Sequence, residues 1–390
     1  MRVDKSKWQK KTIGQIGKVI SGSTPRTDNP SNWEGGTYNW VTPAELKGDK
    51  YYGSTIKKIT DTALESTNLT LMPIGTVLLS SRAPIGKVAI TTEPMYCNQG
   101  FKNIECNSSI HNEFLYYYLR YNNDELNRRG NGVTFKEISK KIVEQFPVIV
   151  PSLEEQKGIA SELDAIQTMI DGYKAQITDL DELANSIFLE TFGDPITNDK
   201  GWELTNLENV SNNNGSYGAG SPSAPKEPNR PRYIRITDID DNGYLNNDFV
   251  VSSNIEDDTS YLLKFGDILF ARTGATVGKR YLYTTSEPQI YAGYLIKFSL
   301  NIDVVSPIFI YHITKTEAYK YWLKNQIIGA AQPNVNAKKY SALPIILPPL
   351  VLQEEFAKKI KVIEKQKEML FEQLADAEHL MAERMQYYFS

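Results

Sequence analysis

Two stretches of the chain carry apolar residues at alternating spacings of three and four, and neither stretch contains a proline. In residues 152–192 these positions are Ile159, Leu163, Ile166, Ile170, Tyr173, Ile177, Leu180, Ala184 and Ile187. In residues 350–390 they are Phe356, Ile360, Ile363, Lys367, Leu370, Leu374, Ala377 and Met381. Runs of more than three heptads are typical of coiled coils, whereas a stripe on a single surface helix is usually shorter. The sequence therefore predicts two long helices that pair along these seam positions.

The direction of pairing follows from where the helices lie in the chain. A helix over 152–192 would be about 60 Å long at roughly 1.5 Å per residue, so it carries the chain away from the residues before it. The second helix starts where the block 193–349 ends. We therefore expect an antiparallel pair that returns the C-terminus toward the first block. Lys367, the one polar seam residue, either fixes the register of the pair or extends its ammonium to solvent.

The rest of the sequence is two copies of one unit. Trp8–Val19 is echoed by Trp202–Val210, Gly75–Arg82 by Gly266–Arg272, and Phe146–Pro151 by Leu343–Pro348. The second pair of segments continues to a Gly-Lys pair in both copies, Gly86-Lys87 and Gly278-Lys279. Matches in the same order and at a nearly constant offset indicate an internal repeat.

Each copy shows both strand and helix patterns. Short β-rich runs at 76–80, 86–92, 267–271 and 290–299 predict strands, and aromatic-rich stretches at 113–129 and 307–325 predict helices. Long polar loops over 21–30 and 212–223 favour a functional role. The predicted fold class is α+β, with two domains related by a pseudo-twofold axis and separated by two long helices in an antiparallel coiled coil. The expected domains are 1–151 and 193–349, and the expected helical regions are 152–192 and 350–390.

Composition and charge restrict the class of protein. The 390 residues are 41% hydrophobic and 23% charged with a mean hydropathy of −0.41, which is typical of a soluble globular chain. The apolar runs are too short to span a bilayer and no signal peptide is evident, so we expect a cytoplasmic protein without a membrane partner. The net charge is −4, but residues 1–151 carry +6 and residues 152–192 carry −7. This contrast is expected where one part approaches phosphates, although a solvated acidic helix beside an ordinary domain would also produce it.

Patterns for catalysis and metal binding are missing from the sequence. Two cysteines, Cys97 and Cys106, and three scattered histidines exclude a disulfide scaffold and a Cys/His zinc cluster, and we expect reduced structural thiols. Gly274–Arg280 resembles a phosphate-binding loop, but it is one residue short and has Arg280 where a hydroxyl residue is needed. We therefore expect a non-catalytic chain with no metal or cofactor of its own.

Several motifs follow one another in a fixed order around the two predicted helices. They are Trp8–Pro25, Trp40–Pro43, Ser80–Ile90, Asn98–Phe101, Phe146–Gln156, Phe270–Gly274, Gln332–Asn336 and Leu343–Gln353. In this order they resemble the specificity subunit of type I restriction-modification systems. The resemblance implies two target recognition domains that each read one half of a bipartite site in double-stranded DNA. It also implies that the helices set the gap between the half-sites and dock two methyltransferase subunits.

The same resemblance assigns the chemistry to other chains. It implies that S-adenosylmethionine is bound by the methyltransferase subunits, which methylate adenine, and that ATP and Mg are used by restriction subunits, which translocate and cleave DNA. The observations made without it agree, because two similar domains, a long spacer and no catalytic pattern are what such a subunit requires.

Candidate DNA contacts lie in loops and after strands, where the two copies differ most. In the first domain they are Thr24, Arg26, Arg82, Lys87, Asn98 and Gln99, and in the second they are Arg272, Thr273, Lys279, Gln332 and Asn334. Arg and Lys suit phosphates or guanine edges, and Asn and Gln suit adenine edges.

Each of these residues also has a structural alternative. Arg82 and Arg272 could brace a turn through ion pairs, Asn98 could cap the backbone, and Gln332 and Asn334 could form an ordinary turn around Pro333. Two other functions fit parts of the sequence: a nucleotide-dependent enzyme that uses Gly278-Lys279, and a coiled-coil adaptor that binds proteins.

Overall fold

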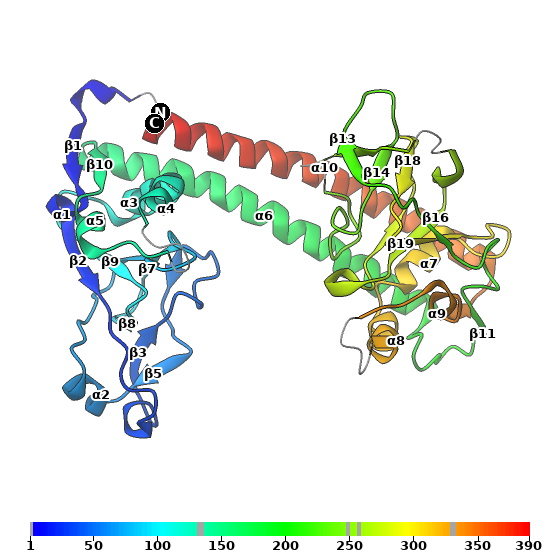
Figure 1. Ribbon diagram of the computed structural model, residues 1–390, viewed down its shortest axis with the longest axis horizontal. Helices are drawn as coiled ribbons and strands as arrows, with labels where there is room; N and C mark the ends of the chain where they lie inside the picture. Colours follow the sequence, from blue (N-terminus) through cyan, green and yellow to red (C-terminus); the bar gives the residue numbers. More distant parts are fainter. Residues whose placement is uncertain (1–2, 131–135, 247–249, 256–258, 328–332) are drawn as a thin grey trace. The chain divides into compact units, whose positions relative to one another are not determined.

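The computed structural model describes residues 3–130, 136–246, 250–255, 259–327 and 333–390. The chain forms two compact units. Unit 1 consists of Met1–Lys174 with Glu372–Ser390, and unit 2 consists of Ala175–Phe371. Each unit contains one half of each long helix, α6 (Leu153–Phe192) and α10 (Leu350–Phe389) (Figure 1). The expected boundaries of the domains 1–151 and 193–349 and of the helical regions 152–192 and 350–390 stay a prediction.

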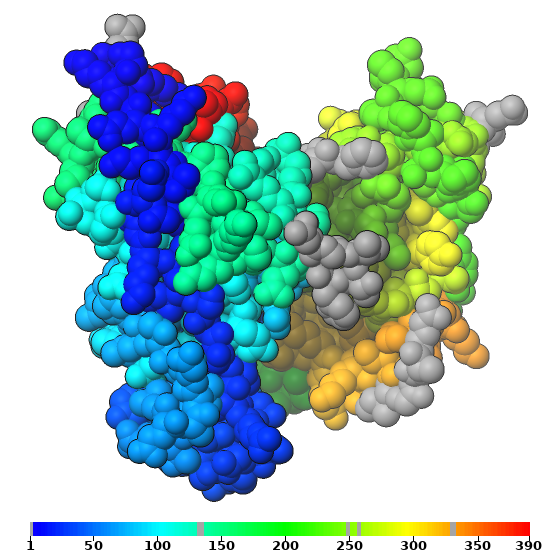
Figure 2. Space-filling model, turned by 60° about the vertical axis from the view of Figure 1, so that its left-hand side comes forward, coloured from blue at the N-terminus to red at the C-terminus, as the bar shows by residue number. Residues whose placement is uncertain are grey.

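The described residues of unit 1 form a five-stranded sheet, a three-stranded sheet and a two-stranded pair. The larger has the strand order β2 (Gly17–Ser21), β9 (Lys102–Cys106), β6 (Val77–Leu79), β7 (Val88–Thr91) and β4 (Tyr51–Tyr52). The smaller has the order β5 (Lys57–Ile59), β3 (Tyr38–Val41) and β8 (Tyr96–Cys97), and β1 (Gln9–Thr12) pairs with β10 (Pro147–Val150). The short helices are α1 (Ile13–Ile16), α2 (Asp61–Ser66), α3 (Asn112–Tyr121), α4 (Asn123–Arg129) and α5 (Lys140–Glu144). Strands β3 and β5 and helix α2 form a lobe at the end of the unit away from α6, and Figure 2 shows this lobe from another side.

Unit 2 repeats this plan. Its larger sheet has the order β12 (Ser216–Tyr217), β19 (Leu295–Ser299), β16 (Asp267–Ala271) and β17 (Arg280–Leu282). Three further pairs are β14 (Arg232–Ile234) with β18 (Gln289–Tyr291), β13 (Ser223–Pro225) with β15 (Val251–Ser253), and β11 (Glu203–Asn206) with β20 (Pro344–Leu347). The short helices are α7 (Pro307–Ile313), α8 (Glu317–Ile327) and α9 (Ala337–Ser341).

The strand order contains the repeat that the sequence predicts. The order β2-β9-β6-β7 of unit 1 matches β12-β19-β16-β17 of unit 2. The antiparallel pair β1–β10 matches β11–β20, and the parallel pair β3–β8 matches β14–β18. Each chain segment that enters a long helix is therefore held by the strand that opens the same unit.

The two long helices run antiparallel, as predicted. In unit 1, Glu162 of α6 accepts from Arg384 of α10 at 2.6 Å, and Lys174 pairs with Glu378 at 2.9 Å. In unit 2, Asp181 pairs with Lys367 at 2.7 Å. Residue numbers rise along α6 while those of their partners on α10 fall, which only an antiparallel pair allows.

The predicted seam residues are buried or half-buried along both helices. The core of unit 1 contains Ile159, Leu163, Ile166, Ile170, Ala377 and Met381, with Tyr173 and Leu374 packed against it. The core of unit 2 contains Ala184, Phe356, Ile360 and Ile363, with Leu180 and Ile187 packed against it, while Ile177 and Leu370 are half-buried. The same two cores include strand residues, so each half of the helix pair belongs to the core of its unit.

A buried glutamine fastens the first turns of each long helix. The Gln156 side chain accepts from the backbone N–H of His111 at 2.7 Å and donates at 2.9 Å to the proline carbonyl that ends the preceding strand segment. Gln353 makes the same two bonds in unit 2, to the N–H of Ser306 at 2.9 Å and to a proline carbonyl at 2.7 Å. Both side chains are fully buried, and His111 and Ser306 are the N-caps of α3 and α7. Each amide thus ties three elements together.

Lys367 lies inside unit 2 and does not reach solvent. It is 1% exposed, and its ammonium contacts Asp181 at 2.7 Å and Glu364 at 3.4 Å. The Tyr244 ring lies 4.6 Å from the ammonium, and burial raises the pKa of Glu364. The prediction that this lysine extends to solvent is therefore wrong, and the ion pairs favour a role in register.

We expect Lys367→Met to destabilise unit 2 strongly. Removing one partner of a buried ion pair typically costs about 3–5 kcal/mol, and Lys315, 3.5 Å from Asp181, would offset part of this. The matched control is Lys174→Met, because that lysine pairs between the same helices but is 55% exposed, where pairs contribute about 0–1 kcal/mol. Urea midpoints measured by circular dichroism compare the two variants. Equal midpoints would contradict a structural role for the buried pair.

The two ends of the described chain lie together in unit 1. The Lys5 ammonium donates to the Ser390 carbonyl at 3.0 Å, and the Val3 N–H donates to the Tyr387 hydroxyl at 3.4 Å (Figure 1). A short linker can therefore join the ends without moving either helix.

We expect a circular permutant with joined ends, opened in the turn that follows Gly193, to fold with a helix content and thermal midpoint close to those of the parent chain. Circular dichroism measures both quantities. The matched control carries the same linker but is opened inside α3, which breaks a buried helix and should not fold. Failure of the first permutant would count against this placement of the ends.

Candidate nucleic-acid interface

An exposed aromatic and cationic cluster lies at one edge of the larger sheet in unit 2. The guanidinium carbon of Arg272 is 4.9 Å from the ring centre of Tyr217 and 6.0 Å from that of Tyr294. Tyr217 is 44% exposed and Tyr294 is 57% exposed, so both rings reach the surface. We call Tyr217, Arg272 and Tyr294 the Tyr-Arg-Tyr cluster.

The backbone fixes the position of the cluster. Arg272 follows β16, and its N–H donates to the Tyr294 carbonyl at 3.1 Å while its carbonyl accepts from Val335 at 2.9 Å. The Tyr217 hydroxyl accepts from the Ala337 N–H at 3.2 Å. Gly218 must be a glycine, because a Cβ there would lie 2.2 Å from the Tyr291 carbonyl oxygen. Three segments distant in sequence therefore meet at one place.

In unit 1 the corresponding region contains two cations, Arg82 and Lys102, that share the carboxylate of Glu137. Arg82 donates to Glu137 at 3.0 Å, and Lys102 lies 3.7 Å from the other oxygen of the same carboxylate. Lys102 is largely buried, and this desolvation lowers its pKa while Glu137 acts in the opposite direction. Arg82 is 48% exposed and can still reach a ligand. The alternative that Arg82 braces a turn through an ion pair is therefore present in the structure, and its DNA contact stays a prediction.

The strand register shows that Arg82 and Arg272 are not equivalent. Arg82 bridges to Glu137 at the position where Thr273 bridges to Asn334. The residue equivalent to Arg272 is Ser81, whose N–H donates to the Gly100 carbonyl at 2.7 Å. The sequence repeat matches Arg82 with Arg272, although Gly75–Arg82 is one residue longer than Gly266–Arg272. Their positions on the two surfaces thus differ.

Lys87 and Lys279 are equivalent, and both hold a loop of their own unit. Lys87 donates to the carbonyls of Pro43 at 3.1 Å and Leu46 at 3.0 Å. Lys279 donates to the carbonyl of Ile239 at 2.9 Å and pairs with Asp241 at 3.1 Å. The Gly-Lys echo in the sequence thus has a structural reason. Their role in DNA binding stays a prediction.

Thr24, Asn98 and Gln99 lie together in unit 1. The Thr24 hydroxyl donates to the Gln99 side-chain oxygen, and the Asn98 side-chain oxygen accepts from the Gly100 N–H at 2.9 Å. The capping alternative for Asn98 is therefore present. The Arg26 side chain is exposed. The backbone carbonyl of Arg26 accepts from the Trp33 indole N–H at 3.0 Å, and this bond anchors the polar loop that carries Arg26.

In unit 2, Asn334 is exposed and Thr273 is half-buried beside it. Gln332 lies outside the described residues. Sequence reasoning missed Tyr217 and Tyr294. Tyr217 fell within a loop already marked as functional, but Tyr294 fell within a predicted strand run, and no local signal places it beside Arg272.

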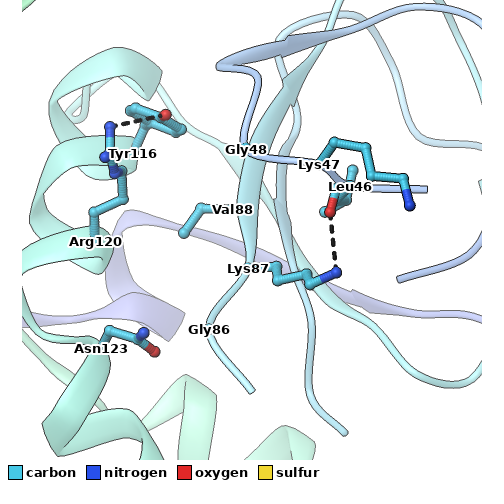
Figure 3. A pocket seen from close by; sticks show the side chains of 9 residues that line it. All are labelled: Leu46, Lys47, Gly48, Gly86, Lys87, Val88, Tyr116, Arg120 and Asn123. Carbon is cyan, nitrogen blue, oxygen red and sulfur yellow. Dashed lines mark hydrogen bonds between the residues drawn. The ribbon is translucent and has the colours of Figure 1, made fainter. Parts of the chain in front are cut away.

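An open pocket of about 390 Å³ lies in unit 1 between α3 and two loops (Figure 3). Its wall includes Lys47, Lys87 and Arg120, but Lys87 is bonded to carbonyls and Arg120 donates to the Tyr116 hydroxyl at 3.2 Å. In unit 2 the loop after β14 occupies the equivalent place, where Tyr311 donates to the Asn242 carbonyl at 3.0 Å. The loop that contains Lys47 in unit 1 and the loop that contains Asn242 in unit 2 therefore differ at this place.

Across the described residues there is no group of His, Cys, Asp and Glu side chains that could hold a metal ion. Gly274–Thr276 forms a 3-10 turn and leads into strand β17, whereas a phosphate-binding loop leads into a helix. Burial raises the pKa of both cysteine thiols to about 12, and burial also lowers the pKa of His312 well below its usual range. Within the part of the chain that the structure describes, no helix is both long and apolar enough to cross a bilayer.

Comparisons with known proteins agree on one family. Residues 5–180 and 200–377 each match the family described as type I restriction modification DNA specificity domain. The MjaIX specificity subunit of Methanocaldococcus jannaschii is 35% identical over 219 residues, which cover 51% of this chain and 50% of that protein, so the match spans about half of the relative. The MjaVIII specificity subunit of the same organism is 22% identical over 373 residues, covering 92% of this chain and 86% of that protein.

Solved structures share the fold. The S subunit of a type I restriction-modification system from M. genitalium has a TM-score of 0.58 at 15% identity, covering 99% of this chain and 97% of that chain. A chain from a study of complex assembly and conformational transition in the type I R-M system has a TM-score of 0.52 at 16% identity, covering 98% and 97%. The family match extends over most of the sequence and recurs once in each half. The chain therefore belongs to the type I restriction-modification DNA specificity family.

Proposed function

We propose that this chain is the DNA-recognition subunit of a type I restriction-modification complex, with each unit reading one half of a bipartite site in double-stranded DNA. The observation that carries the proposal is the contrast between scaffold and surface. The two units share the strand order, the buried glutamine and the lysine that bonds to loop carbonyls, which is Lys87 in unit 1 and Lys279 in unit 2. Their exposed polar groups differ. A duplicated scaffold with two different surfaces suits a protein that reads two different half-sites.

Charge supports DNA as the ligand. Residues 1–151 carry a net charge of +6 in a chain whose total is −4. The phosphate backbone supplies much of the affinity of DNA-binding proteins through such basic regions. Arg26 and Arg82 are exposed in unit 1 and Arg272 reaches the surface of unit 2, so both units offer guanidinium groups.

Exposed apolar residues on the long helices support docking of partner subunits. On α10, Val362 is 61% exposed and Met369 is 55% exposed, and their spacing of seven places them on one face. On α6, Met169 and Leu183 are each 47% exposed. Apolar groups gathered on one face of a helix are typical of interaction surfaces. We propose that two methyltransferase subunits bind here and that the helices set the gap between half-sites.

In this proposal the chemistry is carried out by the partners in the cytoplasm. The methyltransferase subunits would bind S-adenosylmethionine, and restriction subunits would use ATP and Mg. This chain would contribute recognition alone. Filter binding with random DNA, with and without methyltransferase, separates this function from a protein-binding adaptor, which would not retain DNA.

We expect Arg82→Ala to weaken DNA binding several-fold and to lower the salt dependence by about one phosphate contact. The converse variant, Glu137→Gln, removes the carboxylate that neutralises Arg82 and Lys102, so it should strengthen binding. Fluorescence anisotropy at three salt concentrations measures both variants in the full chain with its methyltransferase. An unchanged dissociation constant for Arg82→Ala at fixed salt would reject Arg82 as a contact.

We expect Val362→Glu combined with Met369→Glu to reduce methyltransferase binding at least tenfold, because two desolvated carboxylates would oppose an apolar contact. The thermal midpoint should stay the same, since both side chains are exposed. The control is Ile56→Glu, an equally apolar residue that is 85% exposed in unit 1. Calorimetric titration measures the affinity, and equal affinity for all three chains would exclude this face as the docking surface.

A further inference from the structure

The Tyr-Arg-Tyr cluster places the Arg272 guanidinium beside two aromatic rings. Tyr217 contacts it from β12 and Tyr294 from the turn before β19, and the backbone of Arg272 is bonded on both sides. The Arg272 Nε is buried and makes no hydrogen bond within the described residues. The N–H groups that remain for a ligand are therefore those at the outer end of the guanidinium.

Unit 1 forms the same strand order without this cluster. By the strand register, Tyr217 corresponds to Ser21, because Tyr217 pairs with Ile296 and Ser21 pairs with Lys102 at the matching place in the sheet. Arg272 corresponds to Ser81 and Tyr294 to Gly100, as the matching backbone bonds show. Unit 1 thus folds with two serines and a glycine at these positions. All three residues differ together, which is expected of a recognition element and not of a structural one.

Within the described part of unit 2, no carboxylate compensates the charge of Arg272. Unit 1 has Glu137 beside its cations, whereas the equivalent residue in unit 2 is the neutral Asn334. Among the residues described, Arg272 has no carboxylate partner at ion-pair distance, although it is half-buried. A half-buried guanidinium without a counter-ion is costly, so an acceptor on a ligand would stabilise it.

We propose that Arg272 reads a guanine in the half-site of unit 2, with Tyr217 and Tyr294 as positioning residues that aim its guanidinium. This inference rests on the proposed function. The outer edge of a guanidinium presents two parallel donors, which match the O6 and N7 acceptors of guanine in the major groove. A phosphate can be neutralised by a flexible cation, whereas reading a base requires a guanidinium of restricted movement, and the two neighbouring rings restrict it. Asn334 lies exposed beside the cluster and can contact the neighbouring base.

The test begins with the target of the parent protein. The full chain, assembled with its methyltransferase, selects duplexes from a library with randomised positions, and sequencing gives the base preference at each position. We expect Arg272→Ala to lose the preference for guanine at one position, by about tenfold to a hundredfold, and to leave the other half-site unchanged. Arg272→Lys should lose nearly as much, because an ammonium keeps the charge but lacks the fork.

A modified base tests the same contact without changing the protein. Replacing that guanine with 7-deazaguanine removes the N7 acceptor, so it should weaken binding by the parent complex and have no further effect on Arg272→Ala. Tyr294→Leu should weaken the guanine preference without abolishing it. Arg82→Ala is the matched control, and it should leave preference in the half-site of unit 2 unchanged.

The possible outcomes separate the inference from the proposed function. If the parent complex selects no sequence, the proposed function fails. In another outcome, the parent complex selects a bipartite target while Arg272→Ala lowers the affinity equally for all sequences, or while Arg272→Lys retains the full preference for guanine. In either case Arg272 contacts a phosphate and the inference is overturned. A target without guanine in the affected half-site would also overturn it.

Discussion

The structure depends on how each long helix is joined to the sheets before it. Gln156 and Gln353 are fully buried and bond to backbone groups of two other elements, so an amide in the first turns fixes the direction in which each helix leaves. A buried amide that lost these partners would leave several polar groups unsatisfied, which typically costs about 1–3 kcal/mol for each group. The apolar seam alone lacks this directional control, since hydrophobic contact does not depend on orientation. The two glutamines are thus a stronger constraint on helix direction than the seam.

The two units keep this frame and differ where ligands can reach. Gly22 and Gly218 are retained because a Cβ at either place would meet carbonyl oxygens at 2.2 Å or less. Lys87 and Lys279 are retained because each holds the loop that follows a parallel strand. By contrast, Tyr116 lines an open pocket in unit 1, whereas in unit 2 Tyr311 donates to the carbonyl of Asn242 in a loop. Variation of this kind changes recognition without altering the packing that supports it.

The sequence predicted the elements whose pattern is local. The heptads of α6 and α10, the repeat and the antiparallel pairing all follow from spacing and order along the chain. It did not predict contacts set by strand register. Arg82 and Arg272 look equivalent in the sequence, but Arg82 lies one residue farther from Gly75 than Arg272 lies from Gly266, so Arg82 corresponds to Thr273. Tyr294 reaches Arg272 only because β19 pairs with β16, and no nearby motif encodes that pairing. Gln332 lies outside the described residues, and the remaining DNA contacts stay predictions.

Lys367 shows how one polar residue can select among the registers that an apolar seam allows. Seam positions repeat every seven residues, so sliding one helix by a heptad preserves most apolar contacts. Such a slide would move the partner of Lys367 on α6 from Asp181 to position 174 or position 188, which carry a lysine and a phenylalanine. Either change would leave a buried ammonium beside a like charge or an aromatic core. The residue of α6 that is equivalent to Lys367 is the apolar Ile170. Only the lysine on α10 therefore selects the register of the helix pair, and this difference distinguishes the two halves of the repeat.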